Sequence, residues 1–324
     1  MGRVDVGVFQ NKSHGLSVDD YVAALERRLP DHEVEVGRTT AQKRDLAREA
    51  TVVSAGDISP QRIASDSNLE LFAGIAAGYE HLPLDTLTQN GVVVTNASGV
   101  HAPNAAEQVL AYILAFSRNL RRGWERQRRR EWRHYQAGEL KGSTVTIVGL
   151  GAIGTAIAQR VSAFDVHTIG VRYSPDKGGP TDRVIGFDDD AFRDVLIETE
   201  YLCIASPLTE TTQQLVSADE LEALPPDAFL INVGRGPIVD TDALTTAVQK
   251  NRIGGAALDV TDPEPLPVDH PLWRLGSVTI TPHNAGHSPQ HWSRLADILA
   301  TNIERLERGT DISELQNVVA RPSC

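Results

Sequence analysis

The sequence predicts an α/β protein made of two doubly wound parallel-sheet domains, and three observations support this prediction. The chain has 324 residues, a length that suits two domains. Short apolar strand patterns alternate with helix patterns in both halves, which favours parallel strands with helices over both faces of each sheet. Near the middle, a β-branched strand breaks into a glycine-rich turn and continues as a helix over Thr144–Phe164.

The first hundred residues repeat a strand–helix rhythm that predicts the first sheet. Each apolar run is short and bounded by turn-forming residues, as is typical of buried strands. The predicted strands are Val4–Phe9, Glu33–Val36, Thr51–Ser54, Leu69–Ile75 and Val92–Thr95, and the predicted helices are Val18–Arg28 and, more weakly, Asp45–Ala50.

A longer helix is expected at Pro103–Leu120, because Val109, Ile113 and Phe116 recur on one face. Proline is well tolerated in a first helical turn. From Ser143 the alternation resumes and predicts the second sheet. Its predicted strands are Thr144–Val148, His167–Val171, Tyr201–Ile204, Phe229–Val233, Ala256–Val260 and Val278–Thr281, with helices at Ala152–Phe164, Ala191–Glu198, Ala218–Leu224, Asp242–Lys250 and Pro289–Glu307.

The segment Arg118–Arg133 carries eight arginines together with Trp124 and Trp132. One interpretation is a nucleic-acid contact patch. The other is a projecting arm whose arginines pair with Glu125 and Glu131 or with an acidic second subunit. With 43 acidic against 31 basic residues and a net charge of −12, the chain as a whole repels nucleic acid, which favours the arm.

Global composition favours a cytoplasmic enzyme-like chain. Apolar residues make up 41% of the sequence, but no apolar run approaches the ~20 residues that span a membrane, and the first residues lack the apolar core of a signal peptide. Cys203 and Cys324 are too few and too far apart to suggest a disulfide scaffold. Only five basic residues are lysines, which indicates either a salt-adapted protein or a GC-rich genome.

The pattern Gly149-x-Gly151-x-x-Gly154 predicts a dinucleotide-binding turn, because it follows a strand and opens a helix. Gly149 would make the tight turn, Gly151 would let the backbone approach a pyrophosphate, and Gly154 would let the helix pack on the strand. The free N–H groups and positive dipole end of the helix would then hold the pyrophosphate. A structural glycine-rich turn is the alternative.

The end of the next strand indicates which dinucleotide is preferred. An NAD site usually places an acidic residue there to hold the ribose 2′-hydroxyl, whereas this chain has Arg172, followed by Tyr173 and Ser174. A guanidinium can bind a 2′-phosphate that a carboxylate would repel, so we expect NADP(H) to be preferred, with NAD(H) also accepted. The alternative is that Arg172 only covers the adenine face.

Three polar residues follow successive strands of the second sheet, where α/β folds place their functional groups. Arg235 lies between two glycines after Phe229–Val233, where a guanidinium can grip an anionic substrate. His283 follows Val278–Thr281 and can exchange a proton near neutral pH. Glu264, between two prolines, can hold and orient that imidazole. A surface ion pair, a structural histidine and an exposed loop acid are the respective alternatives.

With these motifs in view, the chain resembles the D-isomer-specific 2-hydroxyacid dehydrogenase family over nearly its whole length. The matching stretches are V-G-L-G-A-I-G at 148–154, N-V-G-R-G-P at 232–237, A-L-D-V…E-P-L-P at 257–267, T-P-H-N-A-G at 281–286 and A-A-G-Y-E at 76–80. A further matching stretch begins with N-A-S-G at 96–99 and continues to Glu107. The resemblance implies two flavodoxin/Rossmann-like domains with the active site in the cleft between them. The substrate domain would be discontinuous, 1–100 plus 288–324, and the dinucleotide-binding domain would be 101–287.

The resemblance also implies a set of roles. Arg235 would bind the carboxylate and carbonyl oxygen of a 2-ketoacid, His283 would be the acid in reduction and the base in oxidation, and Glu264 would hold His283. Backbone N–H groups of the substrate loop at Ala77, Gly78 and Tyr79 would grip the carboxylate, and an arm at about 118–143 would embrace a second subunit in a homodimer. The implied cofactor contacts are Gly149, Gly151, Ala152, Ile153, Gly154, Arg172, Tyr173, Ser174, Ser206, Pro207, Thr212, Val233, Gly234, Asp259, His283, Ala285 and Gly286.

Two other functions share this fold. A dinucleotide-sensing corepressor would need assembly rather than turnover, and the complete Arg–Glu–His set argues against it. An amino-acid dehydrogenase would need a lysine near the substrate, and none of the lysines ends a predicted strand of the core sheet. The sequence therefore predicts reversible hydride transfer between NADP(H) and a 2-ketoacid/2-hydroxyacid pair, with no metal ion, nucleic acid or membrane involved, and leaves the particular ketoacid open.

Overall fold

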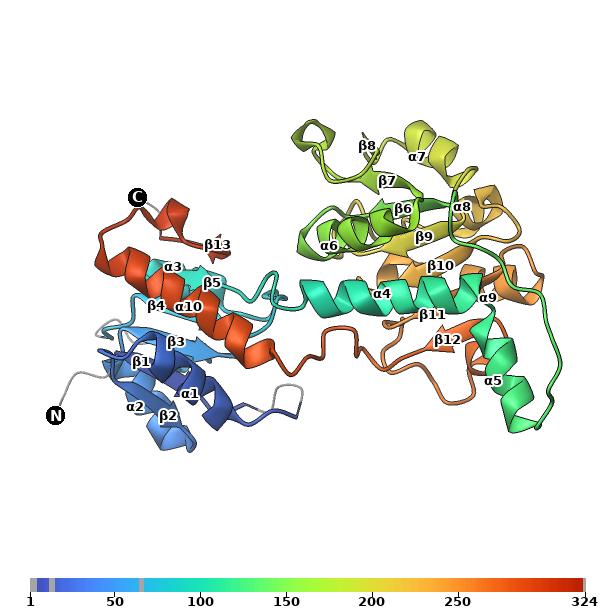
Figure 1. The fold of residues 1–324 in the computed structure, drawn as a ribbon. Coiled ribbons are helices and arrows are strands. Elements are labelled where there is room, and N and C mark those ends of the chain that lie inside the picture. Colours follow the sequence, from blue (N-terminus) through green and yellow to red (C-terminus); the bar gives the residue numbers. More distant parts are fainter. Residues whose placement is uncertain (1–4, 12–14, 64–66, 323–324) are drawn as a thin grey trace. The chain divides into compact units, whose positions relative to one another are not determined.

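The computed structural model describes residues 5–11, 15–63 and 67–322, so the expected strand residue Val4 and the second cysteine, Cys324, lie outside it. The chain divides into two compact units, one formed by 1–100 with 287–324 and the other by 101–286. Each unit is a separate α/β layer structure (Figure 1).

The first unit contains one six-stranded sheet in the order β13-β5-β4-β3-β1-β2. Five strands are parallel, and β13 pairs antiparallel with β5 at the edge. The order of the parallel strands, 2-1-3-4-5, is that of flavodoxin-like folds. The elements are β1 Val6–Phe9, α1 Val18–Arg28, β2 Val34–Gly37, α2 Thr40–Glu49, β3 Val52–Ala55, β4 Leu71–Gly74, α3 Leu84–Gln89, β5 Val93–Thr95, α10 His291–Glu307 and β13 Val318–Ala320.

Both faces of this sheet are covered, as a parallel sheet requires. On one face, α1 and α10 pack together, with Tyr21 stacked on Trp292 at a ring separation of 4.8 Å. On the other face, Leu46 of α2 and Leu87 of α3 pack against the sheet residue Phe72. The C-terminal helix therefore completes the hydrophobic core of the N-terminal sheet, which makes this unit discontinuous in sequence.

The second unit contains a seven-stranded, wholly parallel sheet in the order β12-β11-β10-β9-β6-β7-β8. The order reverses between β6 and β9, and such a switch point is where open α/β sheets bind ligands, outside the carboxyl ends of the strands. The elements are α4 Ala102–Ser117, α5 Leu120–Arg128, β6 Thr144–Val148, α6 Ala152–Val161, β7 His167–Val171, β8 Arg183–Ile185, α7 Asp189–Leu196, β9 Tyr201–Ile204, α8 Ala218–Ala223, β10 Phe229–Asn232, α9 Thr241–Gln249, β11 Gly255–Leu258 and β12 Val278–Ile280.

The second sheet is also covered on both faces. Helices α4 and α6 bury Ile113 and Ile157 on one face together with Ile147 of β6. Helices α7, α8 and α9 bury an equivalent apolar set on the other face, including Leu221 and Leu244. This double cover explains why the strands read as nearly continuous apolar runs rather than as alternating patterns.

Several elements differ from the sequence-based expectation. Helix α2 begins at Thr40 rather than Asp45, because Thr39 and Gln42 form a reciprocal capping box that starts the helix earlier. The expected helix Pro103–Leu120 ends at Ser117, because Asn119 adopts a left-handed conformation with φ 49° and starts a new helix, α5. Strands β8 and β13 and helix α3 were not expected, since elements of three to six residues give weak periodicity.

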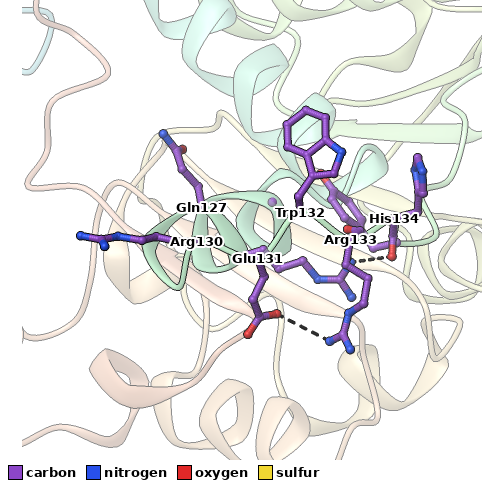
Figure 2. Close-up of a pocket in the computed structure, with 9 residues that line it drawn as sticks. Gln127, Arg130, Glu131, Trp132, Arg133 and His134 are labelled. Carbon is purple, nitrogen blue, oxygen red and sulfur yellow. Dashed lines mark hydrogen bonds and ion pairs between the residues drawn. The ribbon is translucent and has the colours of Figure 1, made fainter.

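The arginine-rich segment forms α5 and an extended return that folds on itself. Arg126 is buried and donates from Nη1 to the carbonyl oxygens of Arg133 and His134, and its guanidinium lies 5.3 Å from the centre of the Tyr135 ring. Figure 2 shows Arg133 turned toward Glu131 and the indole of Trp132 extended away from the segment. Trp132 is fully exposed.

Among the described residues, no helix is long and apolar enough to cross a membrane. Cys203 lies on β9 with its side chain fully buried and its thiol unpaired. Burial also raises the pKa of this thiol, so Cys203 is a packing residue of the sheet.

Candidate active site

Arg235, Glu264 and His283 come together at one edge of the second sheet because they follow three neighbouring strands. Arg235 follows β10, Glu264 lies in the loop after β11, and His283 follows β12, and these strands are adjacent and parallel. Parallel strands present their carboxyl ends at the same edge, which is the edge where this class of sheet binds ligands.

His283 and Glu264 form a direct pair. The imidazole Nδ1 lies 2.7 Å from the Glu264 carboxylate oxygen Oε1. Because an ionised carboxylate can only accept, Nδ1 carries a proton and donates it to Glu264, which leaves Nε2 as the ring atom that can exchange a proton with another molecule. Both side chains are about half exposed, so that nitrogen is accessible.

Asp259 anchors the loop that carries His283. Its carboxylate is buried and accepts hydrogen bonds from the Thr281 hydroxyl and from the backbone N–H groups of Asn284 and Ala285. Its carbonyl oxygen accepts a further bond from the His283 N–H at 2.7 Å. His283 itself has a left-handed backbone, φ 51°, a conformation that a histidine adopts only where surrounding contacts hold it.

The turn that presents Arg235 has room only for glycine on either side. A Cβ at Gly234 would lie 2.7 Å from the Ser206 carbonyl oxygen, and a Cβ at Gly236 would lie 2.0 Å from that of Thr261. Asn232 closes the turn by accepting from the Gly234 N–H and donating to the Arg235 carbonyl. Arg235 donates from Nη1 to the Gly234 carbonyl at 2.8 Å and is partly exposed.

The glycine-rich turn between β6 and α6 has the shape that a pyrophosphate site needs. A Cβ at Gly154 would lie 1.9 Å from the Gly149 carbonyl oxygen. Gly149 has a left-handed φ of +94°, and a Cβ added to it would lie less than 3 Å from the Ser206 backbone. Gly151, at the start of α6, faces open space. Gly149 and Gly154 are therefore required by the packing of the turn, whereas Gly151 leaves the N-terminus of α6 accessible to a ligand.

Two further features fit a bound dinucleotide. The Ser206 hydroxyl is buried and has no hydrogen-bond partner among the described residues, although buried hydroxyls are normally paired. Arg172, after β7, donates from Nη1 to the Gly178 carbonyl at 2.6 Å, and in the described part of the chain its remaining donors are unused. Tyr173 beside it is exposed and Ser174 is partly exposed.

The substrate loop lies in the first unit, directly after β4. Asn96 donates to the Ala77 carbonyl at 2.6 Å and the Ala97 N–H donates to the Ala76 carbonyl, which fixes the loop from one side. Within the described residues, the N–H groups of Ala77, Gly78 and Tyr79 donate to nothing. The loop thus presents unused backbone donors, the type of group that holds a carboxylate.

The other expected cofactor contacts lie on loops of the second unit. Thr212 donates to the Pro207 carbonyl at 2.7 Å, so its hydroxyl stabilises the loop after β9. Ala152 and Ile153 occupy the first turn of α6, Val233 directly follows β10, and Ala285 and Gly286 lie in the loop after His283. The carboxylate of Asp259, another expected cofactor contact, accepts hydrogen bonds from the three donors described above, all of which belong to the protein.

Four polar residues at this edge were not expected from the sequence. Asn232 fixes the Arg235 turn, and Asn104, Gln108 and Tyr112 of α4 contact one another or the loop that carries His283. A signal for the last three was available, because spacings of four residues place them on one helix face. The apolar residues Val109 and Ile113 of the same helix give the stronger periodic pattern.

The comparisons with known proteins agree with this geometry. The family model for the NAD-binding domain of D-isomer-specific 2-hydroxyacid dehydrogenases matches residues 110–285. A glyoxylate reductase from Thermofilum pendens is 34% identical over 249 residues, which is 75% of this chain and 73% of that protein. A D-isomer-specific 2-hydroxyacid dehydrogenase from Xanthobacter autotrophicus, solved with NADPH and MES, has a TM-score of 0.80, 26% identity and 98% coverage of both chains. An NADPH-dependent glyoxylate/hydroxypyruvate reductase from Sinorhizobium meliloti, solved with NADP and malonate, has a TM-score of 0.72 and 27% identity over the whole of both chains.

Together with the α/β fold, these matches define a nicotinamide-dependent oxidoreductase that acts on CH–OH donors. The chain belongs to the D-isomer-specific 2-hydroxyacid dehydrogenase family.

Proposed function

We propose that this enzyme reduces a small 2-ketoacid to the D-2-hydroxyacid, with His283 as proton donor and Arg235 as the ligand of the substrate carboxylate and carbonyl oxygen. The 2.7 Å pair between His283 and Glu264 carries the proposal, because it leaves an accessible imidazole nitrogen at the same edge of the sheet as the Arg235 turn. The names of relatives, glyoxylate reductase and glyoxylate/hydroxypyruvate reductase, make glyoxylate and hydroxypyruvate the first substrates to test.

In the proposed reaction, a nicotinamide dinucleotide held on the glycine turn would supply the hydride that the carbonyl carbon of the substrate accepts. Negative charge then develops on the carbonyl oxygen, and the Arg235 guanidinium stabilises it electrostatically. His283 donates the proton from Nε2 to that oxygen, and Glu264 stabilises the imidazolium from which it leaves. The N–H groups of Ala77, Gly78 and Tyr79 bind the substrate carboxylate. In the oxidative direction the same imidazole removes the hydroxyl proton.

The proposal is tested by a panel of 2-ketoacids assayed by absorbance at ~340 nm, where reduced nicotinamide is consumed. Glyoxylate, hydroxypyruvate, pyruvate, phenylpyruvate and 2-ketoisocaproate are each paired with NADPH and NADH, at low and at molar salt. Saturable oxidation of the nucleotide with at least one ketoacid is the expected result. Binding of the nucleotide without turnover across the panel would contradict the proposed function and favour a dinucleotide sensor.

We further propose that Arg172, Tyr173 and Ser174 bind the 2′-phosphate of NADP(H). Arg172 has unused donors in the described structure and no carboxylate follows β7 directly, which supports a preference for the phosphorylated cofactor. The pyrophosphate would lie on the N-terminus of α6, beside Gly149, Gly151 and Gly154, with the unpaired Ser206 hydroxyl as a further donor.

We expect Arg172→Asp to lower kcat/KM for NADPH by at least ~10-fold, because a charge-assisted hydrogen bond to phosphate is lost and a repulsive charge replaces it. NADH, which has no 2′-phosphate, should be used as well as before or better. The matched control is Arg193→Asp, the same charge reversal on the exposed side of α7. Unchanged discrimination between the two nucleotides would show that Arg172 does not contact the phosphate.

We also propose a homodimer formed through the arm at 118–143. Its support is the exposure of Trp132 and Trp124 together with a hollow of about 670 Å³ lined by Gly123, Arg126, Gln127, Arg130, Glu131, Trp132, Arg133, His134 and Tyr135. Exposed tryptophans and arginines are the residues that most often anchor protein interfaces. A second acidic chain, of net charge −12, complements the arginines of the arm.

We expect light scattering to give twice the mass of one chain for the unmodified protein. Trp124→Ala combined with Trp132→Ala should shift this mass toward the monomer on dilution, because tryptophans at an interface often carry much of its binding energy. Trp273→Ala, which removes another half-exposed indole outside the arm, is the control. A dimer that survives dilution equally in both variants would place the interface elsewhere.

A further inference from the structure

One face of α4 holds the loop that carries the proposed proton donor. His101 and Asn104 contact the carbonyl oxygens of Gly286 and Ala285 at 2.9 and 2.6 Å. Farther along the helix, Tyr112 contacts the Thr281 hydroxyl at 2.5 Å. These contacts reach both ends of the 281–286 loop, with His283 between them.

The hydrogen bonds around Tyr112 have a defined direction. The Thr281 hydroxyl donates its single proton to the Asp259 carboxylate, so it can only accept from Tyr112. The Tyr112 hydroxyl must therefore be the donor to Thr281, and its own oxygen accepts from the Gln108 amide at 2.7 Å. The result is a series of hydrogen bonds in which Gln108 donates to Tyr112, Tyr112 donates to Thr281, and Thr281 donates to Asp259.

Asp259 depends on these donors. It is buried, and among the described residues no cationic side chain forms an ion pair with it. A buried carboxylate without a cation must be stabilised by hydrogen bonds, and each donor that is itself polarised by another becomes a stronger one. The same carboxylate holds the N–H groups of Asn284 and Ala285, next to His283.

We propose that Tyr112 is a positioning residue for His283: its hydroxyl, donated to Thr281, completes the hydrogen bonding of Asp259 and so fixes the left-handed backbone that aims the imidazole. This inference rests on the proposed role of His283 as proton donor. Burial raises the pKa of the Tyr112 hydroxyl, which keeps it protonated and able to donate throughout the working pH range.

The test compares Tyr112→Phe with Tyr201→Phe in the full-length protein. Tyr201 is also buried, but it begins β9 and so lies at the amino ends of the strands, away from the proposed site. We expect Tyr112→Phe to lower kcat about 10-fold, as expected when a catalytic group is slightly misplaced, with unchanged nucleotide KM and one nucleotide bound per chain. The solvent deuterium isotope effect on kcat should rise, because proton transfer becomes more rate-limiting.

Variants of Thr281 test whether the two residues act as one chain. Thr281→Ser keeps the hydroxyl and should stay within about twofold of the unmodified kcat. Thr281→Val removes it, and combining Thr281→Val with Tyr112→Phe should cost no more than Thr281→Val alone, since both break the same chain. Multiplied losses in the double variant would overturn the inference.

Hydrogen exchange provides a readout that does not depend on turnover. Peptides that cover residues 281–286 should exchange faster in Tyr112→Phe than in Tyr201→Phe, because the N–H groups of His283, Asn284 and Ala285 all donate to Asp259. Equal exchange and equal kcat in the two variants would overturn the positioning role. An unmodified enzyme that reduces no ketoacid would instead contradict the proposed function, while the exchange comparison would still decide whether Tyr112 holds the loop.

Discussion

Replacing His283 is expected to lower kcat by at least ~100-fold, which is the contribution of a positioned proton donor. His283→Asn is the preferred variant, because His283 has φ 51° and asparagine accepts a left-handed backbone better than alanine does. Nucleotide affinity should be retained, since the glycine turn and Arg172 belong to other strand ends. The measurements are kcat with the best ketoacid and nucleotide Kd by fluorescence.

The control for this loss is His270→Ala. His270 lies in the same unit, but its Nδ1 accepts from the Leu272 N–H and caps a short 3-10 helix, a structural contact outside the site. It should therefore leave kcat nearly unchanged. Near-normal turnover of His283→Asn would show that another group supplies the proton.

Replacing Arg235 by lysine is expected to lower kcat/KM for the ketoacid by ~10²-fold or more, the cost of losing one donor to a developing oxyanion. Lysine keeps the positive charge but loses the planar fork that can hold a carboxylate and a carbonyl oxygen together. Since Gly234 and Gly236 fit their neighbours so closely, the turn itself should not rearrange to compensate. The nucleotide KM should change little.

Arg252→Lys is the matched control for Arg235→Lys, because Arg252 forms an exposed ion pair with Glu222 at 2.7 Å, and exposed pairs contribute little to stability. A loss confined to nucleotide binding in Arg235→Lys would place this guanidinium on the cofactor rather than on the substrate. Partial rescue of Arg235→Ala by added guanidinium would support the substrate role.

Much of the fold could be predicted because the central strands of both sheets are buried. Runs such as Tyr201–Ile204 and Thr144–Val148 appear as strands in both the expectation and the structure, since burial on both faces leaves an apolar signal that needs no partner to be recognised. The sequence pattern starts α2 later than the structure does and extends the long helix past Asn119, because caps and left-handed residues act over one or two positions and carry little periodicity.

The α/β class follows from the sequence alone, and the sequence also predicts the dinucleotide-type turn and the candidate site residues Arg235, Glu264 and His283, because each of these inferences rests on residues that are close together along the chain. The tertiary structure adds the 2.7 Å contact between Glu264 and His283, and it alone shows that the Asp259 carboxylate binds the loop that follows β12 and that Tyr112 of α4 reaches Thr281. Those contacts join residues far apart in sequence, and they depend on strand order and helix packing, which local patterns do not specify.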